Sequence, residues 1–234
     1  MLPKLKERLL LPERMDDPTL VESEHIHALR GLRRLNCWTG NAKAAWSPIR
    51  DLAATQATQP LTLLDVATGA GDVPCRLLRY ALSSGVPLEV HACDASRRAL
   101  DFARHSFPTE STIRLFQLDV VAEPIPNRYD VVMCTTFLHH LSRDDALVTL
   151  RKMRNAARKR VVVVDLERAA VNWLQVWLGC QLLTRSRVVH FDGPQSVRAA
   201  FTMDEIWRLA NHAGFSALRI HRQWPCRFVL VGDV

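Results

Sequence analysis

The chain has 234 residues, of which 48% are hydrophobic and 24% charged, as is typical of a single globular domain with a sizeable core. Its formal net charge of +7 would suit an anionic partner such as nucleic acid. The densest basic cluster, residues 151–160, instead fits the exposed face and last turn of one helix. We interpret it as a solvated face, and nucleic acid is disfavoured as a partner.

The six cysteines form no CxxC pair, and no Cys/His grouping has zinc spacing. We therefore expect free thiols in a reducing cytoplasm and no dedicated metal site. The segment 1–17 is too charged, and too interrupted by proline, for a signal peptide. The longest uncharged run, Ala169–Thr184, is too short to span a bilayer. The sequence makes no prediction of the oligomeric state.

The N-terminal part of the chain has helical signals and lacks strand signals. Apolar residues recur at helical spacing over Thr19–Asn36. Ala42–Ala57 predicts a second helix, with Pro48 near a bend. We expect an N-terminal helical cap over residues 1–58 and a main domain over 59–234.

From Leu61 onward, predicted strands alternate with predicted helices. The strands are Leu61–Val66, Leu88–Cys93, Ile113–Leu118, Tyr129–Thr135, Arg160–Leu166, Phe215–His221 and Arg227–Val231. The helices are Gly71–Ser83, Ser96–His105, Arg143–Ala157, Ala169–Leu183 and Thr202–Ala213. This alternation implies a parallel sheet with helices on both faces, whereas the last two strands, with no helix between them, should pair as an antiparallel hairpin. The predicted fold is α/β: a Rossmann-like, seven-stranded, mostly parallel sheet with a C-terminal hairpin and a helical insert over about 169–200.

Small residues and carboxylates follow the predicted strands. The first strand contains Asp65 and is followed by the turn Gly69–Gly71, the second ends at Asp94, and the third ends at Asp119. Ligands of open α/β sheets bind outside the carboxyl ends of the strands. A Gly-rich turn before a helix lets the backbone approach a nucleotide, and a carboxylate ~20 residues further on accepts hydrogen bonds from ribose hydroxyls. Acids at strand ends also serve as helix caps, so both interpretations stay open.

Pro74 stands where the dinucleotide pattern GxGxxG needs its third small residue, which disfavours an NAD-dependent dehydrogenase. The whole set of motifs resembles the class I S-adenosylmethionine-dependent methyltransferases over about residues 60–231, and within them the ubiquinone/menaquinone-biosynthesis subgroup. The matching segments are Asp65–Pro74, Asp94, Leu118–Val120, Tyr129–Val132 and Leu138–Leu141.

The resemblance implies S-adenosylmethionine as cofactor and S-adenosylhomocysteine as product. The implied cofactor-binding residues are Asp65, Ala67, Gly69, Gly71, Asp94, Ala95, Asp119, Val120 and Thr135. Asp65 would order the loop, Asp94 would bind the ribose, and Asp119 would accept from the adenine amino group. Many family members have glycine at the position of Ala67, and alanine there leads us to expect that this position avoids positive φ.

Two histidines, His139 and His140, follow the fourth strand, beside the expected position of the transferred methyl group. Methyl transfer from a sulfonium requires an aligned nucleophile, and a phenolic nucleophile must also lose its proton. Either imidazole is a candidate general base, and a helix-capping or packing role is the alternative. His190, after the predicted insert helix, is a third candidate, with a role in a surface loop as the alternative.

The predicted insert helix carries an apolar stripe, formed by Trp173, Leu174, Trp177, Leu178 and Leu182. Such a stripe is usually core. The alternatives are a lid over a lipophilic acceptor, or peripheral membrane contact through residues 169–184. We expect O- or C-methylation of a hydrophobic small molecule that is phenolic, quinol-like or lipid-like.

Two other functions stay open at this point. An RNA or DNA methyltransferase would suit the positive charge, but base-amino methylases of this fold usually carry a Pro-Pro-aromatic motif where this chain has Thr135–Leu138. A methyltransferase-like module that binds without catalysis is the non-enzymatic alternative, because fold alone does not decide function.

Overall fold

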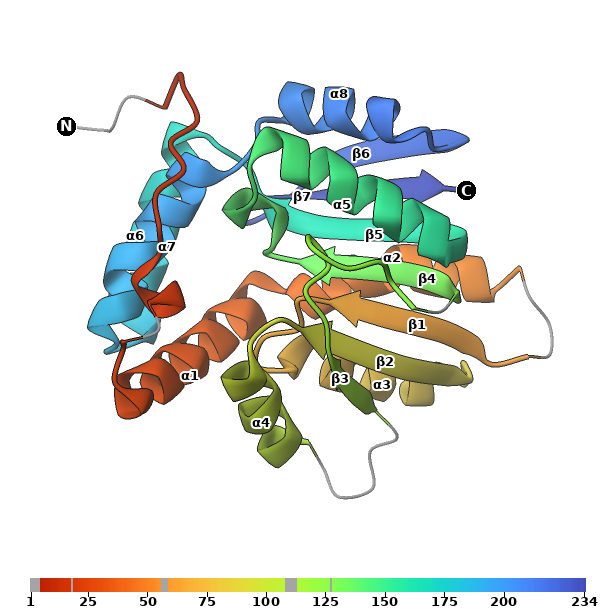
Figure 1. The fold of residues 1–234 in the computed structure, drawn as a ribbon, viewed down its shortest axis with the longest axis horizontal. Helices are drawn as coiled ribbons and strands as arrows, with labels where there is room; N and C mark the ends of the chain where they lie inside the picture. Colours follow the sequence, from red (N-terminus) through yellow and green to blue (C-terminus); the bar gives the residue numbers. More distant parts are fainter. Residues whose placement is uncertain (1–4, 18, 56–58, 108–112, 127) are drawn as a thin grey trace.

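The computed structural model describes residues 5–17, 19–55, 59–107, 113–126 and 128–234. Within this part of the chain, one sheet of seven strands has the order β3-β2-β1-β4-β5-β7-β6 (Figure 1). The strands are β1 (Leu61–Val66), β2 (Leu88–Asp94), β3 (Arg114–Gln117), β4 (Tyr129–Thr135), β5 (Ala157–Leu166), β6 (Ala217–Gln223) and β7 (Arg227–Asp233). Only β7 runs antiparallel to its neighbours, so the predicted sheet and terminal hairpin are confirmed.

The helices of the described residues lie on both faces of this sheet and beside one end of it (Figure 1). They are α1 (Glu22–Thr39), α2 (Asn41–Ala53), α3 (Asp72–Ser83), α4 (Arg97–Ser106), α5 (Arg143–Ala156), α6 (Ala170–Leu183), α7 (Arg187–Ala199) and α8 (Met203–Ala213), with short 3₁₀ turns η1 (Arg14–Asp16) and η2 (Leu138–His140). Pro48 lies inside α2. None of the described helices is both long and apolar enough to cross a membrane.

The hydrophobic core lies on both faces of the sheet because its central strands are covered on each side. Successive residues of a strand point to opposite faces, and Leu63 and Leu64 of β1 are both fully buried. Leu64 packs in a cluster with residues of α5 and α8. Leu63 packs with residues of α2 and α3 on the other face. The near-continuous apolar runs of β1, β4 and β5 follow from this double burial.

Local sequence signals fix several helix ends. Ser96 accepts a hydrogen bond from the backbone of Ala99 and caps α4, and Thr202 and Glu205 form a capping box at the start of α8. Gly214 ends α8 in the left-handed conformation. These caps fix where α4 begins and where α8 begins and ends.

The N-terminal segments and the insert meet beside the carboxyl ends of the parallel strands (Figure 1). Ala28 and Leu35 of α1 pack with Cys180 of α6 and Val188 of α7 in one apolar cluster. The predicted insert over 169–200 thus contains two helices, α6 and α7. The predicted boundary between residues 58 and 59 falls on residues 56–58, outside the described residues, and the division into cap and main domain stays a prediction.

Candidate active site

A cavity of about 770 Å³ lies at the carboxyl ends of the parallel strands. Its floor contains the loops after β1, β2 and β4, and β1 is the strand at which the sheet order changes direction. Residues of η1, α1 and α6 line the opposite wall. This volume is within the range of roughly 300–1,000 Å³ that holds drug-sized ligands.

The loop after β1 bends through left-handed backbone conformations. Gly69 and Gly71 have φ of 54° and 69°. A Cβ on Gly71 would lie 2.5 Å from the Phe107 ring, whereas a Cβ on Gly69 would meet no described protein atom within 4 Å. Gly69 lines the cavity, so its backbone is open to close approach by a ligand.

The expectation that Ala67 avoids positive φ is wrong, because its φ is 54°. In the described residues, Ala67, Thr136 and Cys226 are the non-glycine positions with positive φ. All three line the cavity. Such conformations cost roughly 1–3 kcal/mol each and tend to gather at functional sites. The surrounding structure must hold each of these residues in place.

The carboxylates that follow β2 and β3 both line the cavity. Asp94 accepts hydrogen bonds from the backbone N–H groups of Gly69 and Ser96, each at 2.8 Å. Burial raises the pKa of Asp94. Asp119 accepts from the backbone of Val121 at 2.9 Å. Each carboxylate therefore caps local backbone and still keeps acceptor capacity for a ligand, so the two interpretations of these acids are compatible.

Ala95, Val120 and Thr135 line the same cavity, whereas Asp65 lies behind the loop, outside the lining residues. Its Oδ2 accepts from the Thr68 hydroxyl at 2.7 Å, and among the described residues its Oδ1 has no hydrogen-bond partner. Burial raises the pKa of Asp65 to about 7. Asp65 thus contacts the loop and not the space available to a ligand.

His139 and His140 lie in η2 and line the cavity from the end of β4. The His139 ring nitrogen Nδ1 is 2.6 Å from Asp165 Oδ1, and its backbone N–H also donates to that carboxylate at 3.1 Å. Burial alone would lower the pKa of His139, but the Asp165 charge and hydrogen bond raise it overall. The hydrogen bond leaves the other ring nitrogen, Nε2, for a substrate or ion.

The His140 ring stacks on the His139 ring, with their centroids 4.2 Å apart. Its side chain is 31% exposed, against 4% for His139. Burial and the charge of His139 lower the pKa of His140. The two imidazoles therefore differ: His139 is oriented and more basic, and His140 is open and less basic.

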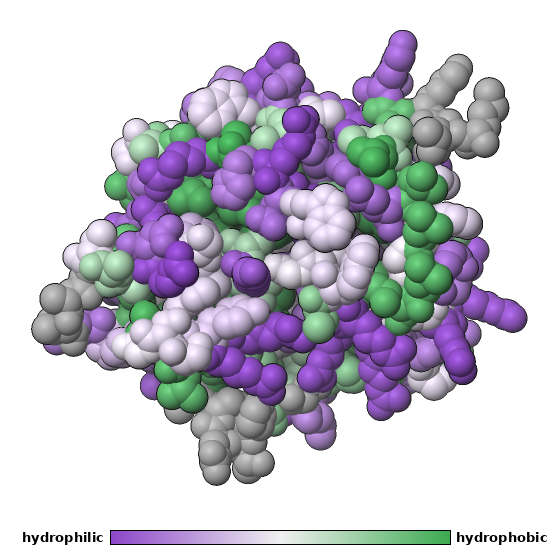
Figure 2. Space-filling view, turned by 180° about the vertical axis from the view of Figure 1, so that it is seen from behind, coloured by the Kyte–Doolittle hydropathy of each residue, from purple (hydrophilic) through white to green (hydrophobic). Residues whose placement is uncertain are grey.

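Two predicted features are not brought to the cavity. His190 lies in α7 and hydrogen-bonds the backbone carbonyl of Thr184 at 2.9 Å, outside the residues that line the cavity. The apolar stripe of α6 points mainly outward, on the face of the molecule seen in Figure 2. Its Leu182 is 80% exposed. The α6 residues that line the cavity are instead Gln175, Val176, Gly179 and Cys180. The stripe is thus neither plain core nor the inner face of a lid.

Two buried charged residues of the cavity wall were not among the predicted site residues. Asp72 lies inside the Asp65–Pro74 motif, whereas no motif marks Arg227. Asp72 and Arg227 are 7% and 5% exposed, and both line the cavity. Asp72 Oδ2 and the Nε and Nη1 atoms of Arg227 have no hydrogen-bond partner among the described residues. Burial raises the pKa of Asp72 to about 6 and lowers that of Arg227. Buried polar groups without partners are costly, and here they face a space that a ligand can fill.

Residues 63–160 match a family model described as "Methyltransferase domain". The matched segment begins inside β1 and ends inside β5, and it covers less than half of the chain. No protein of curated function matches the chain by sequence. The seven-stranded, Rossmann-like methyltransferase fold recurs in solved structures.

Three of these structures illustrate the likeness. PigF with SAH has a TM-score of 0.60 at 19% identity, over 86% of this chain and 56% of that chain. Human N-acetylserotonin methyltransferase in complex with SAM has a TM-score of 0.65 at 15% identity, over 91% and 56%. The plantazolicin methyltransferase BpumL in complex with SAH has a TM-score of 0.65 at 12% identity, over 94% and 92%. The chain thus spans little more than half the length of the first two.

Proposed function

We infer that this chain transfers a methyl group from S-adenosylmethionine to a hydrophobic small molecule. The observation that carries this proposal is the cavity, which joins two chemically different halves. One half contains the loop after β1 with Asp94 and Asp119, and the other contains His139 and His140. Similar structures hold SAM or SAH, which supports the cofactor.

The cofactor would occupy the half of the cavity formed after β1, β2 and β3. Asp94 would accept hydrogen bonds from the ribose, and Asp119 and Val120 would contact the adenine. Asp72 and Arg227 carry opposite charges and unpartnered atoms, so they suit the ammonium and carboxylate of the methionine part. Arg227 already donates one hydrogen bond to Thr39 at 2.9 Å, which orients its guanidinium.

The acceptor would lie in the other half, between η2 and the helices. Leu29, Leu32 and Leu35 of α1, with Val176 of α6, give this wall an apolar surface, which favours a hydrophobic acceptor. His139 Nε2 would take the proton of a phenolic hydroxyl as the oxygen attacks the methyl group in line with the departing sulfur. Helices α1 and α6 cover this half, so it suits a small molecule better than a nucleic-acid strand.

Three finer points of the proposed function stay predictions: the ubiquinone/menaquinone subgroup, the choice between O- and C-methylation, and peripheral membrane contact through residues 169–184. The outward-facing apolar side chains of α6 support that last prediction (Figure 2). Val171, Leu174, Trp177, Leu178 and Leu182 are exposed.

Calorimetric titration with S-adenosylhomocysteine tests the proposal. Asp94→Ala should weaken binding at least ~100-fold, because it removes a charged acceptor worth roughly 1.5–3 kcal/mol per hydrogen bond and loosens Gly69. Asp101→Ala, at an exposed position of α4, is the matched control and should bind as the unaltered chain does. Equal affinity in the two variants would refute the cofactor site, and with it the proposed function.

A further inference from the structure

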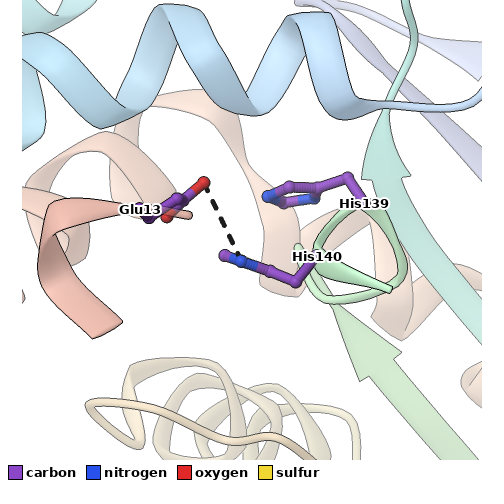
Figure 3. A group of neighbouring side chains, drawn as sticks. All are labelled: Glu13, His139 and His140. Atoms are coloured by element: carbon purple, nitrogen blue, oxygen red, sulfur yellow. Dashed lines mark ion pairs between the residues drawn. The ribbon is translucent and has the colours of Figure 1, made fainter. Parts of the chain in front are cut away.

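Three side chains that can bind a metal ion converge in the acceptor half of the cavity. Glu13 comes from the segment before η1, and His139 and His140 come from η2. Figure 3 shows the three side chains pointing toward one another. One ligand atom from each lies within 4.8 Å of those of the other two, and all three residues line the cavity.

Asp165 orients the His139 ring in the way that a carboxylate usually orients a metal-bound histidine. It occupies the Nδ1 side of the ring at 2.6 Å and leaves Nε2 as the remaining ligand atom. Metal-ligating histidines almost always give their other ring nitrogen to such a carboxylate, which fixes the ring and its tautomer. The stacked His140 ring, 4.2 Å away between centroids, places a second imidazole beside the first.

Glu13 is fixed in place by contacts on both sides of it. The Ser196 hydroxyl donates to Glu13 Oε1. The next two backbone N–H groups, of Arg14 and Met15, donate to the Asp192 carboxylate at 2.9 and 3.0 Å. These contacts attach the N-terminal segment to α7 and hold the Glu13 carboxylate beside η2.

Within the described part of the chain, no Lys or Arg side chain forms an ion pair with Glu13. Its side chain is 12% exposed, and its ion pair among the described residues is with His140, at 3.8 Å. A second carboxylate oxygen, of Asp16, lies 4.0 Å from the same His140 nitrogen. Two carboxylates therefore share one imidazole, and a divalent cation would balance their charge.

We propose that Glu13, His139 and His140 bind a divalent transition-metal ion such as Zn²⁺. Two imidazoles and one carboxylate form the ligand set of many catalytic zinc and iron sites, which keep open positions for a substrate. Ligands about 2.1 Å from a tetrahedral ion stand roughly 3.4 Å apart, so the three side chains must close around it. The His140 side chain, which is 31% exposed, can make this adjustment, whereas Asp165 holds His139 and Ser196 holds Glu13.

A bound ion would change how the acceptor is activated. This consequence rests on the proposed function, whereas the binding of the metal does not depend on it. An acceptor hydroxyl bound at an open position would release its proton to solvent and remain as an oxyanion on the ion. That oxygen would form the new O–C bond as the C–S bond of the cofactor breaks. The proton would then need no imidazole base.

Metal titration tests the proposal in the full chain, with exposed Cys37 replaced by serine to remove a competing thiol. After treatment with a chelator, Zn²⁺ calorimetry should show one ion bound per chain, and Co²⁺ should develop visible d–d absorption. Loss of a carboxylate that only orients a ligating histidine, as in Asp165→Asn, usually weakens metal binding about 10–100-fold. Loss of a direct ligand, in Glu13→Gln or in His140→Ala, should weaken Zn²⁺ binding by more than that. His190→Ala, which alters a histidine outside the cavity, should not.

Absence of stoichiometric Zn²⁺ binding would overturn the metal site, as would equal affinity in Glu13→Gln, His140→Ala and His190→Ala. Binding of S-adenosylhomocysteine by each variant shows that it is folded. It also separates the two hypotheses. Cofactor binding without metal binding refutes only the metal site, whereas metal binding without cofactor binding refutes only the proposed function.

Discussion

The two halves of the cavity are built in different ways. In the cofactor half, the loop after β1 and Asp94 come from adjacent strands and are tied by the Asp94–Gly69 hydrogen bond at 2.8 Å. In the acceptor half, Glu13, η2 and Val176 of α6 come from distant parts of the chain. The first half is therefore visible as a sequence motif, whereas the second exists only once the chain is folded.

If the halves have separate tasks, altering the acceptor half should change turnover and leave cofactor affinity intact. In His139→Asn, the asparagine amide nitrogen can take the place of Nδ1 beside Asp165, while the atom corresponding to Nε2 is lost. We expect kcat toward alkyl-substituted phenols to fall roughly 10²–10⁴-fold, the usual contribution of a positioned acid or base. Radiolabelled methyl transfer measures kcat, and calorimetry measures S-adenosylhomocysteine affinity.

His190→Asn is the matched control, because its ring caps the end of α6 at Thr184 and lies outside the cavity. Unchanged turnover in His139→Asn would remove this residue from the chemistry. A parallel loss of cofactor affinity would show that the two halves are not separable.

The cofactor half should also respond to pH through a buried acid beneath its loop. The pKa of Asp65 is about 7 in the fold, raised by burial, against ~3.9 in an unfolded chain. The folded state binds this proton more tightly, so the free energy of unfolding is highest below the unfolded pKa and falls as pH rises toward 7. Between pH 5 and 8 the loss should be roughly 2–3 kcal/mol.

Asp65→Asn should abolish that part of the pH dependence, because the amide does not titrate and can still accept from Thr68. Urea unfolding of the cofactor-free chain at several pH values measures how the free energy of unfolding depends on pH. The exposed Asp101→Asn makes the same charge change and should keep the wild-type slope. Equal slopes in all three proteins would mean that Asp65 is not the group responsible.

Arg227 sharpens the comparison further, since it reaches the cofactor half from a distant strand. We expect Arg227→Met to weaken S-adenosylhomocysteine binding about 10–100-fold, the loss of a charged hydrogen-bonded pair. Binding of 5′-methylthioadenosine, which lacks the methionine carboxylate and ammonium, should not change. Calorimetry measures the affinity of the variant for both ligands. An equal loss of affinity for the two would mean that Arg227 does not bind the methionine carboxylate.

The contrast between the halves also explains what the sequence could predict. Strand β1 was predicted with its observed bounds, because a buried apolar run and a Gly-rich turn are local signals. Helix α7 was not predicted, because Gly193 and Pro194 lie inside it and both residue types disfavour the interior of a helix. The outward face of α6 could not be predicted either: periodicity shows that a stripe exists but not which way the helix turns.

Ala67 gives the smallest and most local test, because it departs from a rule inferred from residue type alone. Its φ of 54° costs an alanine roughly 1–2 kcal/mol, and the greater unfolded-state entropy of glycine offsets part of the gain. Ala67→Gly should therefore raise the free energy of unfolding by at most about 1 kcal/mol. Ala70→Gly, in the same turn without positive φ, should lower it by roughly 0.5–1 kcal/mol. Urea unfolding of the two variants measures both changes. The changes in the free energy of unfolding should have opposite signs if strain is stored in the cofactor loop, and the same sign if it is not.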